Sequence, residues 1–202
     1  MKKIAHFLKK YWPTIAIIAV VMAIVGLVEY HSGRLPLGPD GKFGWWDGNV
    51  WGDENSQRLT DAYSFSHVIH GILFYAFFWL IVRIMPARLR ERFPLRYRLL
   101  AAVVIEAAWE ICENSSFVID RYRSATIAIG YVGDSIMNSL ADIVCMMVGF
   151  LIARISKIWV SIALIIVLEV GCLFWIRDNL TLNVLMLVYP VESVKVWQSV
   201  GH

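Results

Sequence analysis

Five apolar segments, each about as long as a bilayer is thick, constrain the fold of this chain more than any other feature. They cover residues 12–29, 64–85, 99–119, 134–155 and 158–176. A transmembrane helix needs about 20 mostly apolar residues. The chain is 58% hydrophobic and 17% charged, with a mean hydropathy of +0.60, which is more apolar than a soluble domain of this length. The sequence therefore predicts an all-α membrane bundle of about five transmembrane helices in one domain, residues 1–202.

Three further segments complete this organisation. Residues 1–11 are basic and precede an apolar run that is longer than a signal-peptide core, and no small-x-small cleavage site follows it. We therefore expect an uncleaved first helix. Residues 30–63 form a polar loop rich in Gly, Pro, Asp and Trp, and we expect it on the periplasmic side. The tail, residues 177–202, is interrupted by Pro190, and we expect it to lie along the membrane surface.

The distribution of basic residues predicts the orientation of the bundle. Lys and Arg gather in the N-terminal segment, in the loop 86–98 and in the turn after residue 153, and these three segments are separated by two crossings each. Cytoplasmic segments carry an excess of Lys and Arg. We therefore expect the N-terminus in the cytoplasm and the C-terminus in the periplasm, in a bacterial cell inner membrane.

The charge and the cysteines argue against two other classes of protein. The net charge of +3 gives no reason to expect a nucleic-acid partner, and the bilayer is the expected partner instead. Cys112, Cys145 and Cys172 all lie in apolar segments without metal-type CxxC spacing. We expect them to be buried small apolar residues rather than a disulfide framework or a metal site.

Three of the predicted helices carry polar residues that lipid would not tolerate. They are His67 and His70; Glu106, Glu110, Glu113 and Asn114; and Asp134, Asn138 and Asp142. Within each set the spacing is three or four residues, so each set lies along one helix face. A charge at mid-bilayer costs at least about 2.5–3.5 kcal/mol. The three faces should therefore meet inside the bundle.

Matching depths support this arrangement. At about 1.5 Å per residue, Glu113 and Asn114 lie level with Asp134. Glu110 then lies near Asn138, and the two histidines enter from the same outer side. The sequence predicts a polar cavity that opens toward the periplasm.

The residue types suggest metal-assisted or acid–base chemistry in that cavity. His67 and His70 are plausible ligands of Zn²⁺ or another divalent metal, which is the one cofactor that we expect. Crowded carboxyl groups raise one another's pKa, so that one can act as an acid and another as a base. The candidate catalytic residues, as acid–base groups or additional ligands, are Glu110, Glu113, Asp134 and Asp142.

The candidate substrate-binding residues flank this set. Arg121 and Arg123 follow the third helix at its outer end, and the Arg fork fits phosphate in a bidentate manner. Asn114 and Asn138 lie on the polar faces beside the candidate acids. Together these residues suggest a lipid or lipid-linked substrate. Snorkelling arginines paired with Asp120 are an alternative for the first two.

Two other functions remain open for the polar cluster. It could be a structural core that only fixes helix register, or it could be a path for protons or a solute. A transporter built from repeats should show two similar halves or broken helices, and the chain shows no convincing repeat. The alternatives to an enzyme are therefore a small transporter and a membrane scaffold.

Several motifs resemble an uncharacterised family of bacterial inner-membrane proteins. They are Trp51-Gly-Asp-Glu-Asn-Ser56, Phe65-Ser-His-Val-Ile-His-Gly71, Trp109-Glu-Ile-Cys-Glu-Asn-Ser115, Ile119-Asp-Arg-Tyr-Arg123, Tyr131-Val-Gly-Asp-Ser135 and Arg177-Asp-Asn-Leu-Thr-Leu-Asn183. The resemblance covers nearly the whole chain. It implies a multi-pass cell-membrane protein and brings no established activity or catalytic residues.

Two weaker resemblances rest on fewer residues. VanZ-like membrane proteins have a His-Gly pattern on one helix, a glutamate on the next and a Gly-Asp followed by an Asn/Asp pair on another. Lipoprotein signal peptidases have Asn and Asp pairs that are similar to Asn114…Asp120 and Asn138…Asp142 here, although these spacings are longer than in that family.

Overall fold

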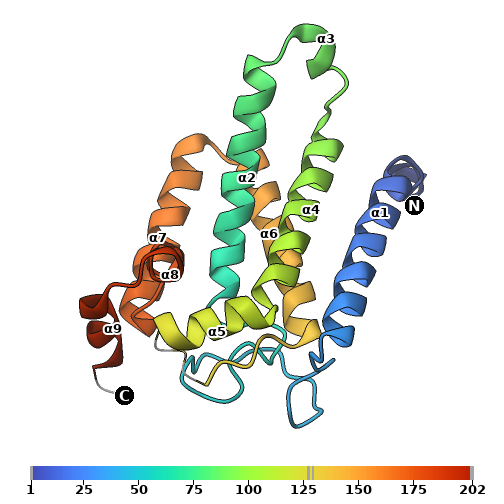
Figure 1. The fold of residues 1–202 in the computed structure, drawn as a ribbon. Coiled ribbons are helices and arrows are strands. Elements are labelled where there is room, and N and C mark those ends of the chain that lie inside the picture. Colours follow the sequence, from blue (N-terminus) through green and yellow to red (C-terminus); the bar gives the residue numbers. More distant parts are fainter. Residues whose placement is uncertain (1, 127, 129, 201–202) are drawn as a thin grey trace.

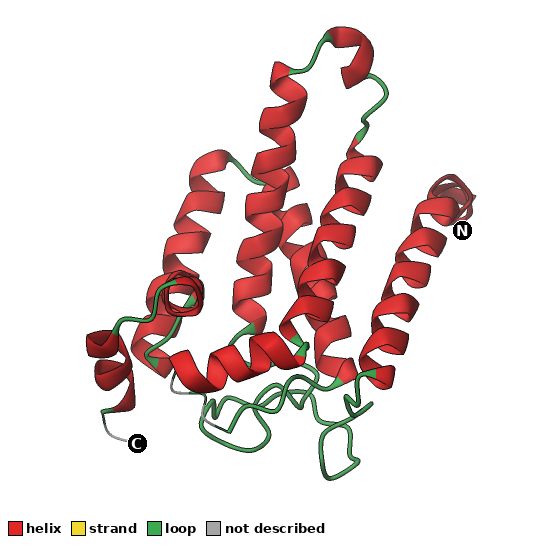
Figure 2. Ribbon diagram, in the orientation of Figure 1, coloured by secondary structure: helices red, strands yellow, loops and turns green. Residues whose placement is uncertain are grey.

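The computed structural model describes residues 2–126, 128 and 130–200, and side chains from residue 11 onward. Its elements are α1 (Lys2–His31), α2 (Ser64–Ile84), α3 (Ala87–Arg90), α4 (Leu95–Glu113), α5 (Ser116–Ala125), α6 (Ile136–Ile155), α7 (Ile158–Ile176), α8 (Leu180–Val188) and α9 (Glu192–Ser199). Over these ranges the structure contains helices and loops and no strand (Figure 2). The all-α expectation is confirmed.

The long helices α1, α2, α4, α6 and α7 run side by side as a bundle (Figure 1). Within the described ranges, four helices are long and apolar enough to cross a membrane: Tyr11–His31, Ser64–Ile84, Ile136–Ile155 and Ile158–Ile176. They agree within two residues with four of the five predicted spans. The protein is therefore a helical membrane protein.

The predicted helix 99–119 differs, because the structure divides this segment between α4 and α5. The break comes at Ser115, whose hydroxyl caps α5 by accepting a hydrogen bond from Val118 N. A cap of this kind satisfies a backbone N–H that would otherwise lack a partner and fixes where a helix begins. As a result α5 leaves the direction of α4 and crosses the end of the bundle (Figure 1).

The tail also contains helices that its sequence did not indicate. Leu180 N donates to Glu169 Oε1 of α7 at 3.0 Å, and Thr181 N donates to Glu169 Oε2 at 3.2 Å. These bonds fix the start of α8 against the side of α7. The tail therefore folds back on the bundle before α9 begins.

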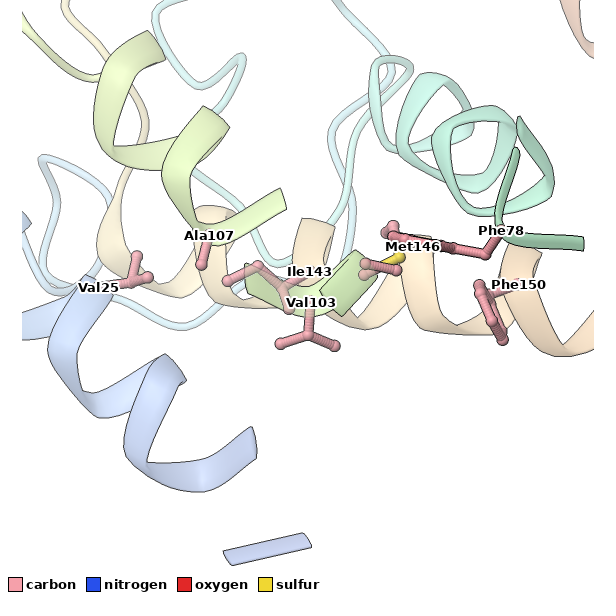
Figure 3. Close-up of a cluster of buried hydrophobic side chains, with 8 residues drawn as sticks. Val25, Phe78, Val103, Ala107, Ile143, Met146 and Phe150 are labelled. Atoms are coloured by element: carbon pink, nitrogen blue, oxygen red, sulfur yellow. The ribbon is translucent and has the colours of Figure 1, made fainter. Parts of the chain in front are cut away.

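Two glycines bring α2 and α6 into close contact. A Cβ atom at Gly71 would overlap the carbonyl oxygen of Met146, and one at Gly149 would overlap that of Val68. Small residues at helix crossings allow this approach of backbones in membranes. Beside the crossing, the apolar core joins α1, α2, α4 and α6 through buried residues (Figure 3): Val25, Phe78, Ala102, Val103, Ala107, Ile143, Met146 and Phe150.

The loop between α1 and α2 covers one end of the bundle (Figure 1). It is fixed by Arg58, whose guanidinium pairs with Asp40 at 3.1 Å and with the carboxylate of Glu54. These two acids raise the pKa of Arg58, and Arg58 lowers the pKa of Asp40. The loop is therefore a folded part of the protein, and it forms the outer boundary of the site.

Candidate functional site: a carboxylate–imidazole cavity

A cavity of about 280 Å³ lies between α2, α4, α6, α8 and the covering loop. Its polar lining includes residues from all three faces that the sequence predicted to meet: His67, His70, Glu106, Glu113, Asp134, Asn138 and Asp142. The size is just under the roughly 300–1,000 Å³ typical of small-molecule pockets. The cavity can therefore hold a small polar group.

The two histidines of α2 converge on one carboxylate of α4. His67 Nδ1 donates to Glu106 Oε1 at 2.6 Å, and His70 Nδ1 donates to the same oxygen at 3.0 Å. The spacing of three places both rings on the same face of α2, one turn apart. Glu106 and His67 are buried, while His70 is half-buried, so this contact holds the acid and one of the two imidazoles away from water.

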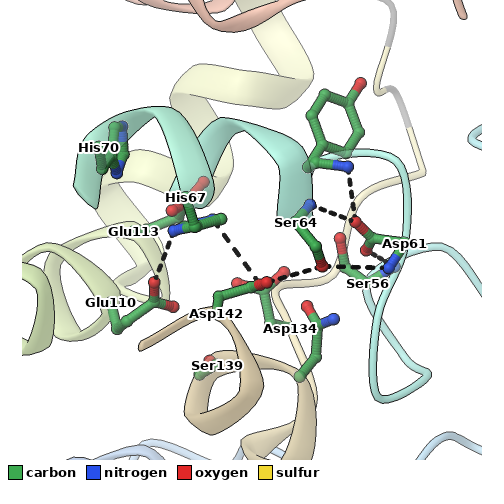
Figure 4. Close-up of polar contacts among 12 residues, drawn as sticks. Ser56, Asp61, Ser64, His67, His70, Glu110, Glu113, Asp134, Ser139 and Asp142 are labelled. Atoms are coloured by element: carbon green, nitrogen blue, oxygen red, sulfur yellow. Dashed lines mark hydrogen bonds and ion pairs between the residues drawn. The ribbon is translucent and has the colours of Figure 1, made fainter. Parts of the chain in front are cut away.

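Glu110 lies one turn further along α4 and completes what we call the His–Glu cluster: His67, His70, Glu106 and Glu110. Its Oε1 is 3.3 Å from His67 Nδ1, and Figure 4 shows the carboxylate pointing toward that ring. Among the described residues, neither oxygen of Glu110 has a hydrogen-bond partner, although the side chain is completely buried. The contact with His67 compensates part of this charge, but a buried carboxylate that accepts no hydrogen bond still costs free energy.

The spacing of these atoms suits a metal ion. Potential ligand atoms of His67, His70 and Glu106 lie within 4.8 Å of one another, and so do those of His67, Glu110 and Glu113. Imidazole nitrogen and carboxylate oxygen are ligands of Zn²⁺ and related divalent metals. The unpartnered oxygens of Glu110 are free to bind a cation, so the residues fit such an ion.

Asp142 of α6 connects the cluster to the covering loop. Its Oδ2 is 3.7 Å from His67 Nε2, and its Oδ1 accepts a hydrogen bond from Ser64 Oγ at 2.8 Å. Ser64 in turn lies against Asp61, which accepts hydrogen bonds from the backbone of Ser56 and Tyr63. Burial raises the pKa of Asp61, and the nearby Asp134 raises it further. The side chains form a continuous polar row in Figure 4.

A second group, the Asp134 network, consists of Asn114, Tyr131, Asp134 and Ser139. Asp134 Oδ1 accepts from Tyr131 Oη at 2.9 Å, and Oδ2 accepts from Asn114 Nδ2 at 2.9 Å. Asp134 N donates to Asn114 Oδ1 at 2.6 Å, while Asn114 Nδ2 also reaches Ser139 Oγ at 3.1 Å. Burial raises the pKa of Asp134. This network has a partner for each oxygen of its acid.

The remaining predicted residues have defined positions. Asn138 donates to the backbone oxygen of Arg58 at 2.9 Å, which attaches α6 to the covering loop. Glu113 lines the cavity and accepts a hydrogen bond from Tyr122 Oη at 2.8 Å. Glu110 and Asn114 lie behind the lining, next to residues that reach the cavity.

The structure does not bring Arg121 and Arg123 to the cavity. Arg121 Nε donates to the carbonyl oxygen of Leu187 at 2.8 Å, and Arg123 Nε donates to that of Tyr131 at 2.6 Å. Neither residue lines the cavity. Their contacts position α8 and the segment after α5, so the two arginines act here as structural residues of the outer end.

Sequence reasoning gave no role to three residues that the cavity contains. Glu106 was recognised as intramembrane, but its position between two histidines depends on how α2 and α4 pack. Asp61 and Asp178 lie outside the predicted helices, so no periodicity marked them. Asp178 accepts from Tyr63 Oη at 3.2 Å and Gln198 Nε2 at 3.1 Å, and burial raises its pKa to about 6.

Comparison with known proteins identifies relatives over most of the chain. Residues 29–200 match the model of a family described as "Protein of unknown function (DUF2585)". A UPF0314 protein of Rhizobium etli is 48% identical over 190 residues, covering 94% of this chain and 92% of that protein. A UPF0314 protein of Sphingopyxis alaskensis is 47% identical over 184 residues, covering 91% and 93%. No solved structure matches.

Proposed function

Because the chain belongs to the family described as "Protein of unknown function (DUF2585)", we propose its function from the cavity itself. The protein is a membrane-embedded, metal-assisted or acid–base hydrolase or transferase that acts on a lipid or lipid-linked substrate. The observation that carries this proposal is the buried carboxylate of Glu110, which lies 3.3 Å from His67 but accepts no hydrogen bond among the described residues. A purely structural core would satisfy both oxygens of such a group with hydrogen bonds.

The cluster supplies the parts that such chemistry needs. Either of two groups that share His67 would hold a divalent metal: His67, His70 and Glu106, or His67, Glu110 and Glu113. A metal in such a site polarises an oxygen of the substrate and lowers the pKa of bound water. Asp142 and Asp134 face the same cavity, where either can accept or return a proton.

The proposal also includes the orientation of the protein in the bilayer. The distribution of basic residues supports an N-terminus in the cytoplasm and a cavity at the periplasmic side of a bacterial inner membrane. The single substitutions Asp53→Cys and Arg92→Cys, each made in a chain whose native cysteines are replaced, test this. An impermeant thiol reagent should label the Asp53→Cys variant and not the Arg92→Cys variant in intact cells. The opposite pattern would reverse the orientation.

A membrane scaffold is the second candidate, and the Asp134 network favours it. Its acid is paired at both oxygens, as expected for a group that only joins helices. The two candidates differ in the His–Glu cluster, because a scaffold has no use for an unpartnered acid there.

Metal analysis of detergent-purified protein tests the proposal. The wild type should contain about one equivalent of a divalent transition metal per protein chain. The double variant His67→Ala/His70→Ala should lose this metal. His31→Ala is the matched control, because His31 is exposed at the end of α1 and outside the cavity. The control should keep the metal.

An activity measurement completes the test. Wild type, double variant and control are incubated with a bacterial lipid extract in mixed micelles, and water-soluble products are identified by mass spectrometry. A product that requires the two histidines and disappears with a chelator supports the enzyme. Metal-free wild type that releases no product would leave the scaffold as the better interpretation.

A further inference from the structure

One wall of the cavity is apolar and reaches the surface of the bundle. Ile105 of α4 and Val184 of α8 both line the cavity, yet they are 41% and 47% exposed. A residue that lines a cavity and is also exposed lies at an opening. Phe74, Trp109 and Leu180 continue the same apolar wall inward. The cavity therefore opens between α4 and α8.

This opening lies at the depth of the hydrocarbon region. Ile105 precedes the end of α4 at Glu113 by eight residues, which is about 12 Å along a helix. Glu169, to which the start of α8 is bonded, precedes the end of α7 at Ile176 by seven residues, or about 10 Å. In Figure 1, α4 and α8 flank α2, and α5 crosses below them. The opening faces lipid rather than the aqueous phase.

The interior behind the opening is acidic. Six carboxyl groups line it: Asp61, Glu106, Glu113, Asp134, Asp142 and Asp178. No lysine or arginine lines the cavity within the described residues, and the nearby Arg121 and Arg123 are bonded to backbone oxygens outside it. The two histidines that line the same interior, His67 and His70, together with one divalent ion would offset at most four of these six acids, so an excess of acidic groups remains. A negative potential of this kind selects a positively charged group.

We propose that the cavity binds the amine-bearing head group of a membrane lipid, which enters sideways between α4 and α8 while its acyl chains stay in the bilayer. A volume of about 280 Å³ holds a head group but not the chains. Leaving the chains in lipid also avoids exposing their apolar surface to water. The inference rests on the proposed function only in taking this cavity as the substrate site.

Photocrosslinking in vesicles tests the proposal without measuring turnover. Two probes are compared, phosphatidylethanolamine and phosphatidylglycerol, with identical chains that carry a diazirine near the ester. The amine-bearing probe should label Ile105, Trp109 and Val184 about tenfold more than the phosphatidylglycerol probe, equal to about 1.4 kcal/mol. Val104 is exposed on α4 and does not line the cavity, so both probes should label it equally.

A blocking variant tests the route of entry. Val184→Trp places a large ring in the opening and should remove the labelling of Trp109 while Val104 is still labelled. Leu185→Trp is the matched control, because Leu185 is exposed on the same helix and does not line the cavity. Labelling of Trp109 that survives Val184→Trp would overturn lateral entry. Equal labelling by both probes would overturn the amine selectivity.

The results separate this inference from the proposed function. Selective labelling by a protein that contains no metal and releases no lipid product would support the opening and contradict the enzyme. A metal-dependent lipid product without selective labelling would support the enzyme and contradict the opening.

Discussion

The His–Glu cluster and the Asp134 network lie in the same protein interior, but they differ in how completely their acids are paired. Both oxygens of Asp134 accept hydrogen bonds from side chains. Both oxygens of Glu110 lack a hydrogen bond among the described residues, and its Oε1 has only an ion-pair contact of 3.3 Å with His67 Nδ1. Because a buried acid without hydrogen bonds is costly, the fully bonded network favours a structural role and the incompletely bonded cluster favours a ligand.

The largest change in stability should come from disrupting the close contact between α2 and α6, which supports both groups. Gly71→Ala would place a methyl group on the backbone oxygen of Met146, so α2 and α6 would have to separate. We expect a loss of more than about 3 kcal/mol of stability, in the upper range of overpacked cores. Thermal unfolding in detergent measures it. Gly171→Ala in α7 is the control, since nothing lies within 4 Å of its Cβ position, and it should unfold no earlier than the wild type.

The second largest loss of stability should come from removing Asn114, the residue at the centre of the Asp134 network. This substitution affects the Asp134 network and leaves the His–Glu cluster in place. Asn114→Ala leaves Asp134 N, Asp134 Oδ2 and Ser139 Oγ without their partner. At the lower end of the range of about 1–3 kcal/mol for each unsatisfied group, the three groups together give an expected loss of about 3 kcal/mol. Cys112→Ala, at an exposed position of the same turn, should have little effect. An Asn114→Ala variant as stable as the wild type would contradict a structural role for the network.

These groups also show where sequence reasoning succeeds. Helical periodicity and the antiparallel order of helices predict that Asn114 and Asp134 lie at one level, and the structure joins them through hydrogen bonds. The long apolar runs also predict four membrane spans to within two residues, because their length determines where each span begins and ends. Local pattern and length are sufficient for these features.

Contacts made by the covering loop could not be predicted in this way. Gln57 donates to Gly133 O and Asn138 to Arg58 O, across 76 and 80 residues of sequence. No periodicity links a loop to a helix start, so Asp61 was not recognised as part of the site. The end of α4 was missed for another reason. The cap at Ser115 is a local signal in the sequence, but the apolar residues after it favoured a continued helix in the prediction.

A smaller change in stability concerns Asp178, whose acid is paired but binds its proton more tightly than an exposed aspartate does. Burial raises its pKa to about 6 in the folded protein, against about 3.9 when unfolded. The folded state therefore binds the proton more tightly, and stability is lost as the pH rises from about 4 to about 6. The shift of roughly two units corresponds to at most about 3 kcal/mol.

Asp178→Asn should remove that part of the pH dependence. Asn cannot ionise and keeps one oxygen acceptor for Tyr63 or Gln198. Unfolding midpoints in detergent between about pH 4 and pH 7 should therefore fall less in the variant than in the wild type. Identical pH profiles would show that folding does not raise the pKa of Asp178.

The smallest change in stability should come from Glu110→Gln, and it decides what the His–Glu cluster does. Gln keeps the shape of the side chain and removes the charge. Without metal, the variant should be as stable as the wild type or up to about 1 kcal/mol more stable, because it no longer buries a carboxylate that lacks hydrogen bonds. With Zn²⁺ at about 100 times its dissociation constant, the wild type should gain about 2.7 kcal/mol.

The same variant should gain much less from zinc, since a neutral amide is a poor ligand for a cation that carboxylates bind. Thermal unfolding with zinc and with a chelator measures both effects in one experiment. Asp134→Asn is the matched comparison, because it removes a buried charge from the paired network and should leave the response to zinc unchanged. If Glu110→Gln kept the full zinc response, the unpartnered oxygens of Glu110 would not bind the metal. The difference between the two groups would then be one of packing alone.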